Sequence, residues 1–407
     1  MEPKIRFKGF EGEWKTSTIG EIAPLSGGYA FQSNHFSSVG IPIVRISNIL
    51  ETGIVGGVFA KYAPFDGDAD FRLYDGDAVI AMSGATTGKV AIVHTQGFLY
   101  QNQRVGKFTK TDRVIYDFLT TIVKSHKFRA DLSCLLTSSA QPNASSKDID
   151  SITQSIPLDK DEQQAIGKYF TSLDSQISAS TSRLASLKQM KAASLQAMFP
   201  QEGETVPKIR FKGVEGEWKK VKLNSFAKRV TRKNSHLEST LALTIASAHG
   251  LVSQIDYFNN LVVGSNIRNY YLLKKGEFAY NKSYSNGYPF GSVKRLERYE
   301  QGILSTLYIT FSIDNSISSD YLTHFFDTNL WHKEVAERAA EGARNHGLLN
   351  IGANDFLDIN IWKPESKSEQ QAIASYFTSL DRQISLQSQR LEKLKQIKSA
   401  CLDKMFV

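Results

Sequence analysis

The chain has only two cysteines in 407 residues, Cys134 and Cys401. Two are too few for a disulfide framework or a zinc cluster, so we expect two reduced thiols. No run approaches the roughly 18 apolar residues of a membrane-spanning helix. The N-terminal stretch MEPKIRFKGFEGEW lacks the apolar segment of an export signal. We therefore expect a cytoplasmic protein without a membrane partner.

Motifs that would mark an enzyme are also missing. No G-x-G-x-x-G follows a predicted strand, and no H-E-x-x-H occurs. The absence of any Pro-Pro pair excludes the Asn-Pro-Pro-aromatic motif of amino-methylating DNA methyltransferases. The eight histidines are scattered, and only His324 and His332 have a spacing that weakly suits a metal. We expect no catalytic residues, no metal ligands and no catalysis by this chain alone.

The segment SGATTGKV, from Ser83 to Val90, resembles a phosphate-binding loop only superficially. Gly84 and Gly88 enclose three residues where such a loop has four, and Val90 replaces the hydroxyl residue that holds Mg²⁺. A strand, not a helix, is predicted to follow. We predict a polar hairpin turn that presents Thr86, Thr87 and Lys89.

Size and charge set wide limits on function. A chain of this length favours two or three domains. Its 41% hydrophobic and 22% charged residues are typical of a globular protein. The formal net charge of +8 permits a polyanionic partner without proving one.

Three segments of the chain are written twice. Glu162–Ser178 and Glu369–Ser385 agree at 14 of 17 positions, and PKIRFKGFEGEW at Pro3–Trp14 returns as PKIRFKGVEGEW at Pro207–Trp218. Arg183–Phe199 likewise corresponds to Arg390–Phe406. The chain therefore divides near Val206 into halves of about 206 and 201 residues. The inserts between the repeated pieces, about 22–157 and 226–364, share length and little else.

The C-terminal part of each repeat predicts a helix of about 38 residues, or about 57 Å. Apolar residues keep a 3-4 spacing for about five heptads, which is typical of a coiled coil. Asp161 and Ser368 are predicted N-caps, with Gln164 and Gln371 completing capping boxes. The seam residues are Ile166, Phe170, Leu173, Ile177, Ser180, Leu184, Leu187 and Met198, then Ile373, Phe377, Leu380, Ile384, Leu391, Leu394, Cys401 and Met405.

Neither helix could bury its apolar stripe alone. An antiparallel pairing of the two equivalent stripes, with an insert domain at each end, is the simplest arrangement that closes. The alternative is that each helix packs only on its own domain.

Both inserts predict mixed α/β structure. The first has predicted strands at 41–49, 77–82, 89–94 and 104–109, then a helix near 114–136. The second has predicted strands at 241–248, 276–281 and 304–313, then a helix near 319–340.

Polar and aromatic loops in both inserts carry residue types that hydrogen-bond to base edges and phosphates. The alternative for each loop is an ordinary solvated turn. The candidates of the first insert are Gln32, Asn34, Arg45, Ser83, Thr86, Thr87, Lys89, Gln101, Gln103, Arg104, Ser139, Gln141 and Asn143. Those of the second are Lys228, Arg229, Arg232, Lys282, Tyr284, Asn286, Tyr288, Arg344, Asn345 and His346.

This arrangement resembles the specificity (S) subunits of Type I restriction–modification systems, over nearly the whole chain. The resemblance rests on the KIRFKG-x-EGEW entries, the EQQAI helix starts, the heptad helices, and GGYAFQS, GDAVIAMSGATTGKVAIV and QNQRV in the first insert. In the second insert KKGEFAYNKSYSNGYPFGSV is similar, but a GGYAF loop is missing.

The resemblance implies an α+β fold with a pseudo-twofold internal repeat. Two α/β target recognition domains, 1–158 and 201–365, would be separated by an antiparallel coiled coil of spacer helices, 159–200 and 366–407. Each domain would read one half of a bipartite asymmetric DNA target.

Partners follow from the same resemblance: double-stranded DNA, two methyltransferase (M) subunits, and restriction (R) subunits in the full complex. S-adenosylmethionine, ATP and Mg²⁺ would bind the partner subunits and not this chain. Six aromatic or acidic residues of the helices are not accounted for by the coiled-coil seam alone. They are predicted to dock the M subunits: Tyr169, Phe170, Asp174, Tyr376, Phe377 and Asp381. Packing on their own domain is the alternative. An alternative function is a non-catalytic scaffold whose inserts bind proteins instead of DNA.

Overall fold

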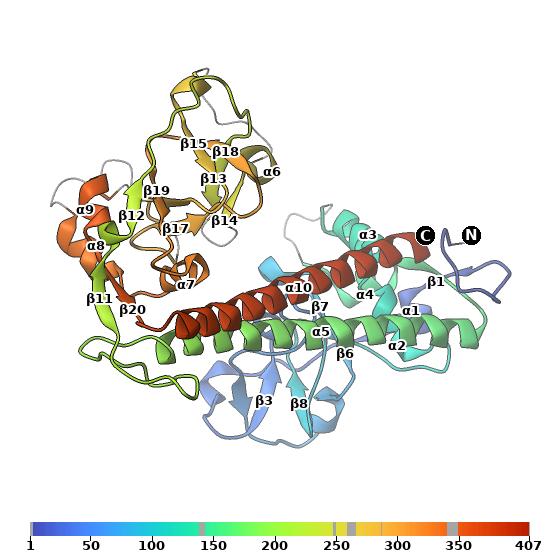
Figure 1. The fold of residues 1–407 in the computed structure, drawn as a ribbon. Helices are drawn as coiled ribbons and strands as arrows, with labels where there is room; N and C mark the ends of the chain where they lie inside the picture. The colour runs from blue at the N-terminus through green and yellow to red at the C-terminus, as the bar shows by residue number, and fades with distance from the viewer. Residues whose placement is uncertain are drawn as a thin grey trace. The chain divides into compact units, whose positions relative to one another are not determined.

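The computed structural model describes residues 3–406 except 138–142, 247–249, 259–265, 286 and 340–348. The chain divides into two compact units, Met1–Ser182 with Gln389–Val407, and Arg183–Ser388 (Figure 1). Each unit thus combines one insert with pieces of both repeated helices. The division into four segments at 158, 200 and 365 remains a prediction.

The first unit contains two four-stranded sheets and one two-stranded ladder. One sheet is antiparallel, in the order β2 (Leu25–Ser26), β9 (Val105–Phe108), β6 (Ala78–Ala81), β7 (Val90–Ile92). The other has the order β4 (Ala60–Tyr62), β3 (Ile41–Val44), β8 (Phe98–Gln101), β5 (Arg72–Tyr74), with β3 and β8 parallel. The ladder pairs β1 (Lys15–Thr18) with β10 (Thr153–Ile156).

The second unit repeats this connectivity with unrelated residues. Its four-stranded sheet runs β12 (Ala227–Arg229), β19 (Ile309–Ile313), β16 (Phe278–Asn281), β17 (Ser292–Arg295). Two antiparallel pairs, β13 (Leu243–Ala246) with β14 (Gly250–Ser253) and β15 (Tyr271–Lys274) with β18 (Gln301–Leu304), take the place of the other sheet. A parallel bridge between Ala242 and Ile303 joins the pairs, as β3 joins β8. β11 (Lys219–Lys222) pairs with β20 (Asn360–Lys363).

The central strands are apolar along most of their length because they are buried. All four residues of β6, Ala-Val-Ile-Ala, are buried, because this strand has neighbours on both edges and packing on both faces. In β16 the first three residues are likewise buried.

Each long helix predicted within an insert is wrong, because the structure has two short helices there. The first unit has α2 (Tyr116–Ile122) and α3 (His126–Thr137), with α1 (Ile19–Ile22) and α4 (Ser146–Asp150) elsewhere. The Ser125 hydroxyl accepts the Phe128 N–H at 3.2 Å, so this serine caps α3 and separates it from α2. The second unit has α7 (Ser319–Phe325), α8 (His332–Arg338), α6 (Gln254–Phe258) and α9 (Ala353–Leu357).

The repeated helices are α5 (Lys160–Ala197) and α10 (Lys367–Met405), coloured green and red in Figure 1. The predicted N-caps are wrong, since Asp161 and Ser368 lie inside the first turn. The residues that cap the two helices lie two positions earlier in the sequence. The Asp159 carboxylate accepts the Asp161 N–H at 2.8 Å, and the Ser366 hydroxyl accepts the Glu369 N–H at 3.3 Å. Among the described residues, no helix combines the length and apolar character needed to cross a membrane.

Buried glutamines tie each long helix to its own insert. Gln163 accepts the Ile115 N–H at 2.8 Å, just before α2, and donates to Pro157 O at 2.8 Å. Gln370 forms the equivalent pair in the second unit, with Ser318 N–H at 2.8 Å and Pro364 O at 3.0 Å. These contacts fix the start of α5 against α2 and the start of α10 against α7.

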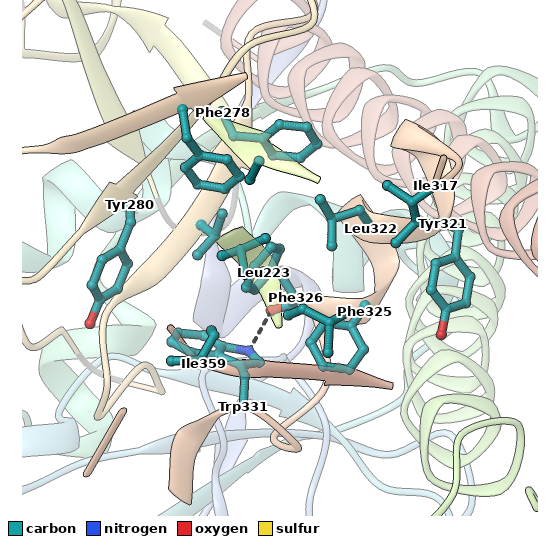
Figure 2. Packing of buried hydrophobic residues seen from close by; sticks show 14 of the residues in the cluster. Leu223, Phe278, Tyr280, Ile317, Tyr321, Leu322, Phe325, Phe326, Trp331 and Ile359 are labelled. Carbon is teal, nitrogen blue, oxygen red and sulfur yellow. Dashed lines mark hydrogen bonds between the residues drawn. The ribbon is translucent and has the colours of Figure 1, made fainter. Parts of the chain in front are cut away.

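The main core of the second unit is rich in aromatic residues. Figure 2 shows Tyr321 and Phe325 of α7, with Phe326 and Trp331 from the connection to α8, packed among strand residues. The indole N–H of Trp331 donates to Phe326 O at 3.2 Å, so its one polar group is satisfied in the core. In the first unit, Leu402, Met405 and Phe406 from the end of α10 join the core formed by the first insert.

Gly167 marks a close approach between α5 and α2. A β-carbon at this position would lie 2.8 Å from Phe118 N and 2.9 Å from Asp117 C, both backbone atoms. We expect Gly167→Ala to destabilise the first unit by about 1–3 kcal/mol, because the backbone of α2 must shift. Thermal unfolding measures the loss. The matched control is Ala374→Gly, at the equivalent buried position of α10, which should cost only a cavity and helix propensity.

Candidate nucleic-acid interface

Many of the predicted DNA-contacting residues fall on four loops of the first insert, and three of the equivalent loops of the second insert also carry predicted residues. Of the others, Gln101 lies on β8, Arg45 follows β3, and the Lys228–Arg229 pair lies on β12. In the first unit these loops connect β2 to β3, β6 to β7, β8 to β9, and α3 to α4. In the second unit the corresponding loops connect β12 to β13, β16 to β17, β18 to β19, and α8 to α9. The match arises because the two inserts share their strand order.

Backbone hydrogen bonds bring all four loops of the first unit together. Met82 N–H donates to Arg104 O at 3.0 Å, and Ala144 N–H donates to Met82 O at 2.9 Å. Tyr29 N–H donates to Gln101 O and Gln103 N–H to Tyr29 O, both at 2.9 Å. Gln103, Arg104 and Asn143 are exposed on the resulting surface, and Ser83 is half-buried beside them.

Unfilled hydrogen-bonding capacity lies on the same side of the insert. Within the described part of the chain, Arg45 Nε, Ser83 Oγ and Thr86 Oγ1 are buried atoms without a hydrogen-bond partner. The turn after β3 adjoins the β6–β7 loop, since a β-carbon on Gly84 would lie 3.2 Å from Ile46 Cδ1. Buried polar atoms are normally paired, so these three are unsatisfied polar groups next to the loop surface.

Other predicted residues of the first insert are less well placed to contact DNA. Gln101 is fully buried, and its amide donates to Ser26 O and Val105 O, both at 2.8 Å. We therefore leave it out of the surface. Lys89 is paired with Glu51 at 2.5 Å. Gln32 and Asn34 are exposed, but on a part of their loop beyond the buried Phe31. Thr87 donates to Gly84 O at 2.6 Å and holds the turn.

The second unit repeats the central contact of this surface. Leu349 N–H donates to Lys282 O at 3.0 Å, as Ala144 donates to Met82, so the β16–β17 and α8–α9 loops also adjoin. Tyr284 is 58% exposed on the first of these loops, and Tyr288 is half-buried. Six predicted residues lie outside the described part of the chain: Ser139, Gln141, Asn286, Arg344, Asn345 and His346.

The basic residues at the start of the second insert differ in whether a carboxylate pairs with them. Lys228 and Arg229 are exposed on β12. Arg232 instead contacts both carboxylate oxygens of Glu277, at 2.8 and 2.7 Å. Its charge is largely neutralised there, so Lys228 and Arg229 are the better phosphate contacts.

One loop escaped the sequence reasoning. The predicted strand 304–313 is wrong, because β18 ends at Leu304 and β19 begins at Ile309. The turn between them is equivalent to the one that carries Gln103 and Arg104, and Leu307 is 63% exposed on it. Its Ser-Thr-Leu-Tyr sequence has no glycine or proline to indicate a turn.

The six predicted docking residues all have partners within their own unit. Phe170 and Phe377 are buried in the cores. The Tyr169 hydroxyl lies 3.6 Å from Cys401 Sγ, and the Tyr376 hydroxyl lies 2.9 Å from Ser194 Oγ. Burial, with the Cys401 contact second, raises the pKa of Tyr169 to about 12. Asp174 is paired with Lys124 and Lys398, and Asp381 with Lys191.

These helix contacts occur twice with the roles of the helices exchanged. In the first unit α5 supplies Tyr169 and Asp174, and α10 supplies Cys401 and Lys398. In the second unit α10 supplies the equivalent Tyr376 and Asp381, and α5 supplies the equivalent Ser194 and Lys191. Reciprocal contacts of this kind are typical of a twofold-related interface.

A charged cluster in the second unit is the one candidate metal site within the described residues. His324, Asp327 and Asp381 place ligand atoms within 4.8 Å of one another. Lys191 Nζ already lies 2.8 Å from Asp327 Oδ2 and 2.7 Å from Asp381 Oδ1. Burial alone would lower the pKa of Lys191, but the two carboxylates outweigh it and raise that pKa. The cluster therefore carries its own cation.

Comparison with known proteins finds one family model and several solved structures that this chain resembles. Residues 11–189 match the model described as the Type I restriction modification DNA specificity domain. None of the curated proteins compared matches the chain. The Type-I restriction-modification system S subunit from M. genitalium is similar, with a TM-score of 0.66 and 14% identity over 100% of this chain and 99% of that chain.

A second solved structure, from work on complex assembly and conformational transition of the type I R-M system, has a TM-score of 0.50 and 14% identity, covering 97% of this chain and 98% of that chain. At such identities these likenesses concern the fold alone. They show that the chain shares a mixed helix and strand fold with a solved S subunit, and the domain match adds to this likeness over residues 11–189. The match to the specificity domain thus covers most of the first repeat, and the likeness in fold to a solved S subunit covers both repeats.

Proposed function

We propose that this chain is the DNA sequence-recognition subunit of a Type I restriction–modification complex, and that each unit reads one half of a bipartite asymmetric target. The observation that carries this proposal is the shared connectivity of the two inserts, which supports unlike polar residues on equivalent loops. One scaffold with two different sets of loops suits two half-sites of different sequence.

We further propose that α5 and α10 form an antiparallel coiled coil that sets the spacer between the half-sites. The reciprocal contacts support this, because each unit pairs the start of one helix with the end of the other. The two α/β target recognition domains, 1–158 and 201–365, would then be joined by spacer helices 159–200 and 366–407.

The partners and cofactors of the proposal follow from the family. Two methyltransferase subunits would dock on the repeated frame, and restriction subunits would join the full complex in the cytoplasm. Those subunits would bind S-adenosylmethionine, ATP and Mg²⁺ and perform the chemistry. This chain would supply the specificity, without a catalytic residue of its own.

Half-site recognition can be tested with one substitution in each unit. Arg104→Ala is expected to relax recognition of one half-site by about 1–3 kcal/mol, because a bidentate arginine contact is lost. Tyr284→Ala, on the exposed β16–β17 loop, is expected to affect only the other half-site. The measurement is methylome sequencing of cells that express each variant with its cognate subunits, followed by binding to duplexes altered in one half-site.

The matched control is Arg129→Ala, an exposed arginine on α3 of the first unit outside the proposed surface. Equal weakening of all duplexes by Arg104→Ala would assign this residue to phosphate contact instead. A salt titration distinguishes DNA recognition from the scaffold alternative, because DNA binding through several phosphates weakens steeply as the salt concentration rises. A flat salt response, or no duplex binding, would favour the scaffold.

A further inference from the structure

The entry segments, Pro3–Trp14 and Pro207–Trp218, keep identical exposed residues in both repeats. Their single difference is Phe10 against Val214, and both of these are half-buried. Lys4, Ile5 and Lys8 are exposed and unchanged in the second copy. Exposed positions tolerate substitution better than buried ones, so this is the reverse of the usual pattern.

Internal contacts account for only part of this identity. Arg6 contacts Glu162 at 2.7 Å and donates to Gly12 O at 2.6 Å, and Arg210 forms the same pair of contacts with Glu369 and Gly216 at 2.8 Å each. Gly12 has a φ of +87°, which requires glycine at that turn. These contacts explain why the arginine and the glycine persist.

The isoleucine side chain is not explained in this way. Ile5 is 43% exposed and Ile209 is 58% exposed. Their backbone N–H groups donate to Lys404 O at 3.2 Å and Ala197 O at 2.9 Å, contacts that any residue except proline could form. An exposed apolar side chain at the same place in both copies therefore needs an external reason.

The age of the duplication does not supply that reason. Exposed positions in the C-terminal halves of the long helices have diverged since the same duplication event. Examples are Ala185 against Glu392, Ser186 against Lys393, and Gln196 against Asp403. The surface of the entry segment is therefore restrained more strongly than the surface of the C-terminal halves of the helices.

We propose that the exposed faces of the two entry segments, centred on Ile5 and Ile209, bind two copies of one protein partner. This proposal rests on the proposed function, in which that partner is the methyltransferase subunit. The partner would supply an apolar pocket for the isoleucine and carboxylates for the flanking lysines.

The chemistry of the segment favours protein over DNA as its partner. Glu11 and Glu13 are exposed in the same segment, as are Glu215 and Glu217 in its repeat, and carboxylates repel phosphates. An exposed isoleucine also has no hydrogen bond to offer a phosphate. In contrast, the helix residues predicted to dock the partner are engaged within their own units.

The repeat itself provides the test. The full chain carrying Ile5→Glu, Ile209→Glu or both is mixed with the methyltransferase subunit, and native mass spectrometry counts the bound copies. Either single variant is expected to bind one copy of the methyltransferase subunit, and the double variant is expected to bind none. Each altered segment should bind that subunit at least about tenfold more weakly. The control is Leu386→Glu, since Leu386 is 56% exposed and differs from its equivalent Ala179. It should bind two copies.

Thermal unfolding verifies that each variant folds, and Ile5→Ala with Ile209→Ala provides a milder pair. Two copies bound by a folded double variant would overturn the proposed surface. So would a double variant that keeps both copies and loses only affinity for DNA. Absence of methyltransferase binding by the unaltered chain would instead contradict the proposed function itself.

Discussion

Replacing Phe406 with alanine is expected to destabilise the first unit by about 3–5 kcal/mol, although this residue is next to the end of the chain. Its side chain is 6% exposed, and its ring centroid lies 6.2 Å from that of Trp14, 5.9 Å from Phe118 and 6.1 Å from Phe170. These three residues belong to the first entry segment, the first insert and α5, respectively. The end of the second repeat thus completes the core of the unit that contains the first insert.

Phe199 supplies the matched substitution in the second unit. It is fully buried, with ring centroids at 5.8 Å to Trp218, 5.8 Å to Tyr321 and 6.1 Å to Phe377. We expect a similar loss from Phe199→Ala. Hydrogen exchange followed by mass spectrometry should place the two effects in different units, with faster exchange in α2 for Phe406→Ala and in α7 for Phe199→Ala.

Leu386→Ala is the control for both, since it is exposed and should change the free energy of unfolding by less than about 0.5 kcal/mol. If Phe406→Ala affected only the last turn of α10, the end of that helix would not be part of the core. Equal effects of the two phenylalanine variants on both units would indicate that the units unfold together.

The helices could be predicted well because two independent signals agreed. The heptad spacing gave their length, and Ile166, Phe170 and Leu173 of the predicted seam are buried. The duplicated sequence located them in the chain. Their first residues could not be predicted as well, because Asp159 and Asp161 are equally good caps in the sequence and only the backbone path selects between them.

The insert helices and loops depended on information that is not local. Ser125 looks like any helix residue until its hydroxyl is seen to accept the Phe128 N–H. Gln101 has the residue type of a base contact, but β8 lies between β3 and β5, which turns this side chain into the unit. Residue type in the sequence therefore did not distinguish exposed candidates such as Gln103 and Arg104 from a buried one such as Gln101.

Sequence reasoning also could not separate docking residues from structural ones. Tyr169 and Asp174 were selected because they exceed the needs of a seam, and the structure gives each a partner on α10. A polar residue beside a seam serves equally well to pair two helices or to bind another chain. Exposed positions that are identical in both repeats provide a way to separate docking residues from structural ones, because such positions have no contact within the chain that would explain their identity.

Deleting one heptad from both long helices is expected to change the spacer length that the protein accepts. Residues 179–185 and 386–392 are equivalent in the repeat. In the proposed antiparallel pair they also lie opposite one another, since Tyr169 contacts Cys401 and Ser194 contacts Tyr376 on either side. Removing both segments keeps those end contacts and shortens the helix pair by about 10 Å.

That shortening equals the length of about three base pairs, at about 3.4 Å each. The original target should therefore bind at least about tenfold more weakly, and a target with a shorter spacer should bind best. Selection from duplexes that carry both half-sites at every spacing measures the new preference.

Deleting residues 179–185 alone is the control for this experiment. It places the two ends of α5 out of register with an unshortened α10, so the contacts of Tyr169 and Tyr376 cannot both form. This variant should unfold at a lower temperature and bind no spacer well, whereas the double deletion should stay stable. If the double deletion folded and still preferred the original spacer, the helices would not set the spacer length. This follows because a helix pair that is shortened at its middle should favour half-sites that lie closer together.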